Sequence, residues 1–135
     1  MKQTQFDRLV IISASLEFKT QLENNDRTLN LGKSLDDLNM NFTSSQGVYR
    51  GSSEQSFVVL PRNDEELQVL KDLAFNNFFQ ESILLRGYNG QAMLVYSDDT
   101  TEELGTIKQV SPKLIEQLES YTVMNGNVYT TEEIL

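Results

Sequence analysis

The sequence predicts an α+β fold of the ferredoxin-like type: a βαββαβ antiparallel sheet with helices on one face, an extra C-terminal helix and edge strands. Short apolar or β-branched runs predict strands, and two longer segments carry apolar residues at helical spacing. These segments alternate as strand, helix, strand, strand, helix, strand. A length of 135 residues with 39% hydrophobic residues favours a single domain, residues 1–135, with one ordinary core.

The first strand and the first helix have distinct patterns. Residues 8–15 form a short β-branched run that ends in small polar residues, which is typical of a central strand buried on both faces. Residues 20–39 carry a stripe of leucines at helical spacing. Three polar residues, 24–26, break the stripe, so we expect an amphipathic helix that is interrupted there.

A hairpin is expected next. Residues 41–51 predict a strand with a bulge at 44–47, and the turn begins at Gly51. Residues 54–60 predict its partner strand, which ends at Pro61 because proline has no backbone donor for the ladder.

The second helix is predicted from a capping-box pattern, in which Asn63 precedes Glu66 by three residues and apolar residues follow at helical spacing up to Phe78. Strands at 81–85 and 91–96 then flank a glycine-containing turn.

The C-terminal part of the chain predicts less regular structure. Residues 98–103 read as an acidic turn region. Ser111 before Pro112 is a helix-start pattern, which predicts a short C-terminal helix. The tail predicts an edge hairpin around residues 125–127.

Composition limits the possible chemistry. The chain has no histidine and no cysteine, which excludes the usual general base, thiolate chemistry and the common zinc ligands. Acidic pairs such as Asp98-Asp99 and Glu132-Glu133 lack a calcium-loop spacing and are expected to be solvated surface, so we expect no metal and no cofactor.

Charge and hydropathy limit the possible partners. A net charge of -9 opposes sequence-independent nucleic-acid binding, which depends on neutralising phosphates. No apolar run has the length of a signal peptide or a membrane span, so we expect a cytoplasmic protein with no membrane contact.

Two places in the predicted sheet suit a ligand. Small residues, Ser13, Ala14 and Ser15, end the first strand, where they leave room and expose backbone donors. Tyr49 and Glu54 stand on either side of the predicted hairpin turn, so a phenol and a carboxylate can reach one volume. An ordinary strand end and an exposed hairpin pair are the alternative interpretations.

Gln80 and Glu81 open the fourth predicted strand directly after the second helix, which places them near the same end of the sheet. A plain connection between helix and strand is the alternative. The seven glycines form neither of the usual nucleotide-binding motifs, which argues against a Rossmann or P-loop site.

The order of several short motifs resembles the small bacteriophage S-adenosylmethionine lyases, formerly called hydrolases. The resemblance covers nearly the whole chain and depends on the order and spacing of its pieces. The matching pieces are Val10-Ile11-Ile12-Ser13-Ala14, Gly47-Val48-Tyr49-Arg50, Glu54, Leu73-Ala74, Gln80-Glu81-Ser82-Ile83-Leu84, Met93-Leu94-Val95-Tyr96, Lys108-Gln109-Val110 and Tyr121-Thr122-Val123.

This resemblance implies a ferredoxin-like subunit, a homotrimer and substrate pockets between adjacent subunits. It also implies that the carboxylate of S-adenosylmethionine attacks the substrate's own γ-carbon, which releases methylthioadenosine and homoserine lactone. Tyr49 and Glu54 match the functional tyrosine and glutamate of the family. We expect the tyrosine ring to face the sulfonium, and Glu54 to contact the substrate's amino group or to anchor Tyr49.

Two other functions stay open from the sequence. A trimeric PII-like nucleotide-binding regulator would need basic residues around a polyphosphate, and few are available near the proposed sheet ends. An acidic DNA mimic that inhibits a host enzyme would need carboxylates on one face, whereas the acids are spread along the chain. The basic residues in question are Arg50, Arg62, Lys71 and Arg86.

Overall fold

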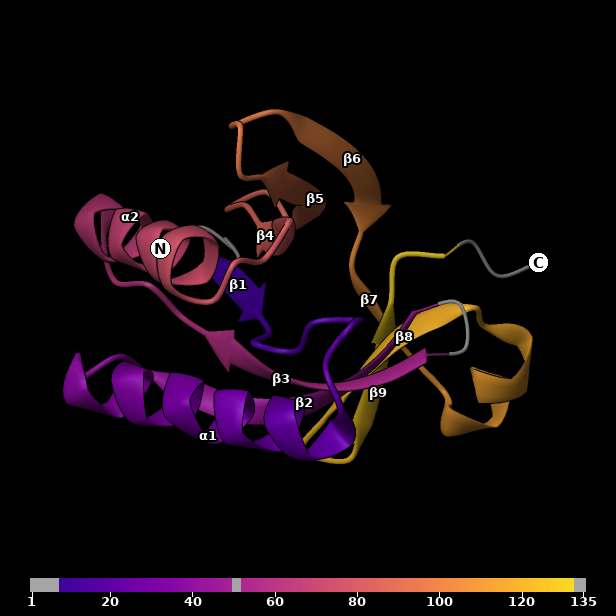
Figure 1. The fold of residues 1–135 in the computed structure, drawn as a ribbon. Coiled ribbons are helices and arrows are strands. Elements are labelled where there is room, and N and C mark those ends of the chain that lie inside the picture. The colour runs from indigo at the N-terminus through magenta and orange to yellow at the C-terminus, as the bar shows by residue number, and fades with distance from the viewer. Residues whose placement is uncertain (1–7, 50–51, 133–135) are drawn as a thin grey trace.

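The structure is a computed structural model that describes residues 8–49 and 52–132. Within these ranges the chain is mostly sheet, with helical segments between some of the strands (Figure 1). The elements are β1 (Leu9–Ile12), α1 (Gln21–Asp37), β2 (Phe42–Tyr49), β3 (Ser52–Val59), α2 (Asp64–Asp72), the π-helical turn η1 (Leu73–Asn77), β4 (Ser82–Arg86), β5 (Gln91–Tyr96), β6 (Thr101–Thr106), β7 (Lys108–Val110), the 3-10 helix η2 (Pro112–Gln117), β8 (Ser120–Met124) and β9 (Asn127–Thr130).

The strands form one antiparallel sheet in the order β6-β5-β4-β1-β3-β2-β8-β9-β7. The sheet curls until its two ends approach each other, as Figure 1 shows. A Cβ added at Gly105 in β6 would lie 3.9 Å from the carbonyl oxygen of Thr131, just after β9. The described chain is therefore a nearly closed, barrel-like sheet.

The prediction of a ferredoxin-like βαββαβ fold is wrong. Residues 91–130 supply five strands, two beyond β4 and three beyond β2, where the sequence suggested one strand, a helix and an edge hairpin. The right-handed twist between neighbouring strands accumulates across a sheet of this width and curls it.

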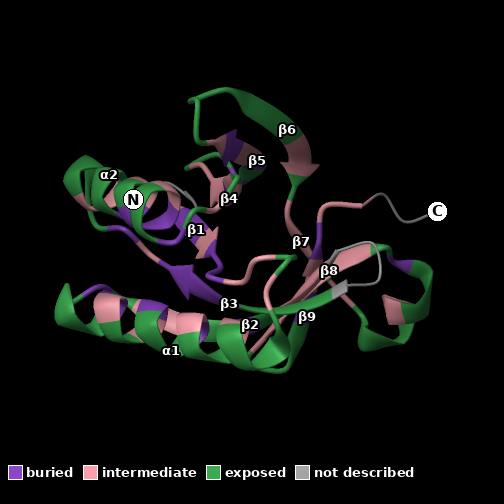
Figure 2. Ribbon diagram, in the orientation of Figure 1, coloured by how far each residue is buried: buried purple, intermediate pink, exposed green. Residues whose placement is uncertain are grey.

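Both helices cover the same face of the sheet. Leu31 and Leu35 of α1 and Leu70 of α2 join one hydrophobic cluster with Val10 of β1 and Val59 of β3. These five side chains are fully buried, and Figure 2 shows that buried residues concentrate where the helices meet the central strands. Burial of each such side chain stabilises the fold by about 1.5–3 kcal/mol. The helices thus hold β1 and β3 rigidly from one side.

The first helix differs from its prediction. It runs without interruption from Gln21 to Asp37 and begins with a capping box between Thr20 and Glu23. The leucines do not share one buried face, because Leu22 and Leu29 are 72% and 71% exposed. The polar residues that were expected to break the helix lie within it and leave its backbone regular.

The hairpin of β2 and β3 also differs. The pairing is regular from Phe42 opposite Val59 to Tyr49 opposite Ser52, so the expected bulge at 44–47 is absent. The expected turn residue Gly51 lies outside the described residues.

The later elements follow the predictions in part. Asn63 accepts a hydrogen bond from the backbone of Glu66 at 2.8 Å and starts α2, and Ser111 precedes the 3-10 helix. The expected hairpin around residues 125–127 is formed by β8 and β9. It lies inside the sheet rather than at its edge, and the second half of the expected acidic turn is the start of β6.

Candidate active site

The segment that follows β1 is held by hydrogen bonds from three directions. Ser13 and Ala14 are buried, and the Ser13 hydroxyl accepts a hydrogen bond from the Ser15 amide at 3.0 Å. Arg27 Nε of α1 donates to the Ala14 carbonyl at 2.6 Å, and Gln80 Nε2 donates to the Ser15 carbonyl at 3.1 Å. The structure thus brings Gln80 and the three small residues together.

Two residues of α1 that sequence reasoning did not select for the site fix this segment. Arg27 also donates to the carbonyl of Phe78, and its guanidinium lies 5.6 Å from the centre of that ring. Asn24 accepts from the Leu16 amide at 2.9 Å and donates to the Leu16 carbonyl at 3.1 Å. The signal for Asn24 was present, because it is one of the polar residues at 24–26 that interrupt the leucine stripe.

Glu54 stands beside the same segment on β3. It pairs with Gly47 of β2, which has no side chain to cover it. Partial burial of its carboxyl group raises the pKa of Glu54, and a hydrogen bond with the Ser13 side chain lowers that pKa by less. The residue as a whole is exposed, so the rise reflects a crowded carboxyl group on an otherwise open side chain. The structure therefore brings Glu54 and Ser13 into contact.

Small polar side chains continue beside Glu54 across the hairpin. Ser56 lies two positions further along β3 and pairs with Ser45 of β2, and both serines are buried. Within the described part of the chain, the Ser45 hydroxyl is buried and has no hydrogen-bond partner. A buried hydroxyl without a partner is costly, and such a group is available to a bound ligand.

Tyr49 is the last residue of β2 and pairs with Ser52. It lies two positions beyond Gly47, the partner of Glu54. Its side chain lies outside the described part of the structure, so the contact expected between the Tyr49 phenol and the Glu54 carboxylate stays a prediction.

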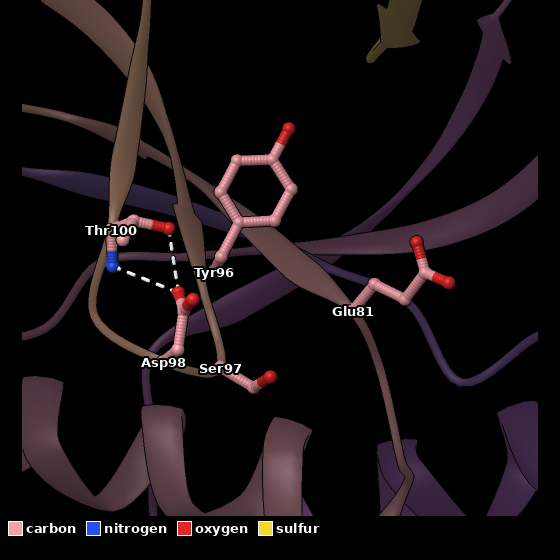
Figure 3. A pocket seen from close by; sticks show the side chains of 5 residues that line it. All are labelled: Glu81, Tyr96, Ser97, Asp98 and Thr100. Carbon is pink, nitrogen blue, oxygen red and sulfur yellow. Dashed lines mark hydrogen bonds between the residues drawn. The ribbon is translucent and has the colours of Figure 1, made fainter.

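Glu81 lines a different feature of the surface. It lines an open pocket of about 370 Å³ that the turn between β5 and β6 completes, as Figure 3 shows. Asp98 in this pocket accepts hydrogen bonds from the hydroxyl and the amide of Thr100, at 2.6 and 3.0 Å, and these bonds lower its pKa. Tyr96 donates its hydroxyl proton to Glu102 at 2.8 Å. This acidic pocket is distinct from the contacts of Glu54.

Residues 8–49 and 52–132 give no support for a metal site or for a membrane-spanning helix. These residues contain no group of three acidic, histidine or cysteine side chains arranged to hold a metal ion. In the same ranges, none of the helices combines the length and the apolar character that crossing a bilayer requires. What the Glu54 region offers is a crowded carboxylate, several hydroxyls and rigidly held carbonyl groups, which together can bind and orient a cation.

A comparison with known protein families identifies the family of this chain. The model described as S-Adenosylmethionine lyase family matches residues 10–132. No curated protein matches the chain significantly. The matched region includes all of the candidate residues, from Ser13 to Glu81, and extends from β1 through β9. The resemblance found in the sequence is thereby confirmed: the chain belongs to the S-adenosylmethionine lyase family, a family of lyases that act on S-adenosylmethionine.

Proposed function

We propose that this lyase converts S-adenosylmethionine into methylthioadenosine and homoserine lactone. In this reaction an oxygen of the substrate's carboxylate forms a bond to its own γ-carbon, and the bond from that carbon to sulfur breaks. The electron pair stays on sulfur, which becomes a neutral thioether. The observation that supports this most directly is Glu54, a crowded carboxylate beside buried hydroxyls in a chain that has no histidine or cysteine.

A chain without a general base is sufficient for this reaction. The attacking carboxylate and the sulfonium neutralise each other, so the transition state is less polar than the ground state and water slows the reaction. The enzyme therefore has to exclude water and fold the methionyl chain into the attack geometry. The segment from Ser13 to Ser15, held by Arg27 and Gln80, supplies a rigid wall for that purpose.

Glu54 has an orienting role in this proposal. Its negative charge attracts the substrate's ammonium group. Because the Glu54 carboxyl group is partly buried, the ammonium group can approach it only from its open side. A carboxylate directly against the sulfonium would stabilise the ground state and slow the reaction, so the amino group is the favoured partner. We further propose that the Tyr49 ring faces the sulfonium, as the resemblance to the family implies, in a cation–π contact worth about 0.5–2 kcal/mol.

A neighbouring copy of the chain is proposed to complete the site, in a homotrimer. Glu54 itself is exposed, so something besides this subunit has to exclude water from it. Large apolar side chains are exposed on α1 and just before it, at 80%, 72% and 71%, and they suit contact with another subunit. They are Phe18, Leu22 and Leu29.

The biological role that fits this reaction is depletion of a methyl donor. Restriction-modification systems that need S-adenosylmethionine would be blunted in a bacterial cytoplasm where the enzyme is made, which suits a bacteriophage protein.

Product analysis tests the reaction. Purified protein is incubated with S-adenosylmethionine in ¹⁸O-water, and the products are separated by chromatography and weighed by mass spectrometry. Methylthioadenosine with homoserine lactone supports the proposal, and any homoserine from later ring opening carries the label in its carboxylate. Label in the γ-hydroxyl would show attack by water and refute the lactone route. Binding without products would favour the nucleotide-binding regulator, and displacement of DNA from a nuclease would favour the DNA mimic.

The role of Glu54 is tested with Glu54→Gln. Turnover is expected to fall at least tenfold while the circular dichroism spectrum stays unchanged, because the substitution removes the charge and keeps the size. Glu103→Gln on the exposed strand β6 is the matched control and is expected to keep full turnover. Full turnover in Glu54→Gln would show that Glu54 has no role in the site. The proposed reaction would then still be tested by its products.

A further inference from the structure

Phe79 has an unusual backbone conformation for an aromatic residue. It lies between η1 and β4 with a φ angle of 57°, in the left-handed region that side chains with a large ring rarely adopt. The residue is 66% exposed, so packing of its side chain within the described chain does not explain the conformation. Residues held in such strained conformations cluster at sites that bind or react.

The structure holds Phe79 in place from both sides. The amide of Phe78 donates to the Leu73 carbonyl at 3.1 Å, and the amide of Gln80 donates to the Ala74 carbonyl at 3.0 Å. Both bonds belong to the end of the π-helical turn, a departure from regular α-helix that is frequent at functional sites. Arg27 donates a hydrogen bond to the carbonyl of Phe78, and the Gln80 side chain donates one to the carbonyl of Ser15.

These contacts place Phe79 at one end of the candidate site. The Gln80 side chain joins this loop to Ser15, and Glu54 contacts Ser13 at the other end of the same three-residue segment. Phe79 and Glu54 therefore flank the same short segment: Phe79 adjoins the residue whose side chain contacts Ser15, and Glu54 contacts Ser13.

We propose that Phe79 binds the adenine ring of the substrate by stacking and so positions the adenosyl half of S-adenosylmethionine. The proposal rests on the proposed function and extends it to the adenosyl half of the substrate, for which Glu54 and Ser13 have no proposed contact. Aromatic rings stack readily on nucleobases, and a ring fixed by its backbone loses little freedom on binding. Phe79 is a positioning residue, because it acts on the base and not on the reacting carbon or sulfur.

Methylthioadenosine is the probe for the test, since it carries the adenine ring and requires no turnover. Calorimetry is expected to show binding to the wild-type protein and about tenfold weaker binding to Phe79→Ala. Phe79→Tyr is expected to keep the affinity within about twofold, because the ring is retained. Tyr88→Ala, which removes an exposed aromatic ring between β4 and β5, is the control and is expected to bind like the wild type. Equal affinity of Phe79→Ala and wild type would overturn the proposal.

A second variant separates binding from folding. Phe79→Gly is expected to raise the melting temperature by about 2–5 °C, because glycine adopts a positive φ without strain, while its affinity for methylthioadenosine falls as in Phe79→Ala. A lower melting temperature would mean that the ring stabilises the fold, and a changed molecular mass by light scattering would mean that it holds subunits together. Either result would overturn the substrate role.

The role of Phe79 and the proposed reaction can be confirmed or refuted separately. If the wild type binds methylthioadenosine and Phe79→Ala does not, Phe79 has the proposed role even where S-adenosylmethionine is not cleaved. If the wild type cleaves S-adenosylmethionine and Phe79→Ala has the same KM, the reaction stands and the role of Phe79 is refuted.

Discussion

Replacing Arg27 by lysine measures how much the segment after β1 depends on one guanidinium. Arg27 donates to the carbonyls of Ala14 and Phe78, which lie 13 and 51 residues away along the chain. Loss of a hydrogen bond to a charged group costs about 1.5–3 kcal/mol. Lysine keeps the charge but lacks the planar fork, so it can replace about one of the two bonds. The free energy of unfolding should fall by about 2 kcal/mol in Arg27→Lys.

Urea denaturation followed by circular dichroism measures this change. Arg62→Lys is the control, because the Arg62 guanidinium likewise makes hydrogen bonds to two other residues, to the Asn39 carbonyl and the Glu66 carboxylate, but is 54% exposed. Exposed pairs contribute about 1 kcal/mol or less, so Arg62→Lys should change the free energy of unfolding by no more than that. Equal stability of Arg27→Lys and wild type would refute the argument that this side chain holds the segment rigid. If the site depends on that rigidity, kcat/KM falls in Arg27→Lys and not in Arg62→Lys.

Three further predictions concern the sheet and its core. Because burial raises the pKa of Glu54, the folded protein binds a proton there more tightly than the unfolded chain does. The stability of the wild type relative to Glu54→Gln should therefore fall as the pH rises from the usual carboxyl range through the raised pKa. A constant difference between the two proteins in urea titrations across this pH range would contradict the burial of the carboxyl group. Ser45→Ala removes a buried hydroxyl without a described partner, so it should leave the free energy of unfolding unchanged or raise it, whereas a loss above about 1 kcal/mol in thermal unfolding would show that the hydroxyl is bonded. Leu35→Ala should cost about 2–5 kcal/mol by urea denaturation, and a loss below about 1 kcal/mol would show that the core refills the space.

The start of α2 could be predicted from the sequence because capping is local. Asn63 accepts a hydrogen bond from the backbone amide three residues ahead, so a short pattern contains the necessary information. The exposed positions of Leu22 and Leu29 could not be predicted in this way, because the buried face of α1 is set by what packs against it. Thr28 is buried on that face although its side chain is polar.

The width of the sheet was missed for a similar reason. Strand β6 has the sequence Thr-Glu-Glu-Leu-Gly-Thr, with no alternation of apolar and polar residues. It is a strand because β5 lies beside it, a contact that no local pattern encodes. Pairing between distant segments therefore decided the fold, and the expected βαββαβ sheet with its edge strands lacked β6 and β7.

The candidate site was predicted in pieces and assembled only by the structure. Ser13 and Glu54 were chosen separately, and they contact each other, as do Ser15 and Gln80. Arg27 was missed because its partners lie 13 and 51 residues away, so no spacing in the sequence indicates it. A long side chain that bonds only to backbone carbonyls leaves no pattern at its partners, since any residue offers a carbonyl.

The two outer strands of the curled sheet bear on how copies of this chain can associate. Strand β7 has only three residues, and β6 carries Glu102 and Glu103, a shift in its pairing with β5 and a positive φ at Gly105. Short, charged or irregular outer strands are poor templates for strand addition by another molecule. Within the described chain, assembly by joining sheets edge to edge is thus disfavoured. Copies of the chain that associate would then meet through side-chain surfaces, where a single substitution can weaken association without disturbing any sheet.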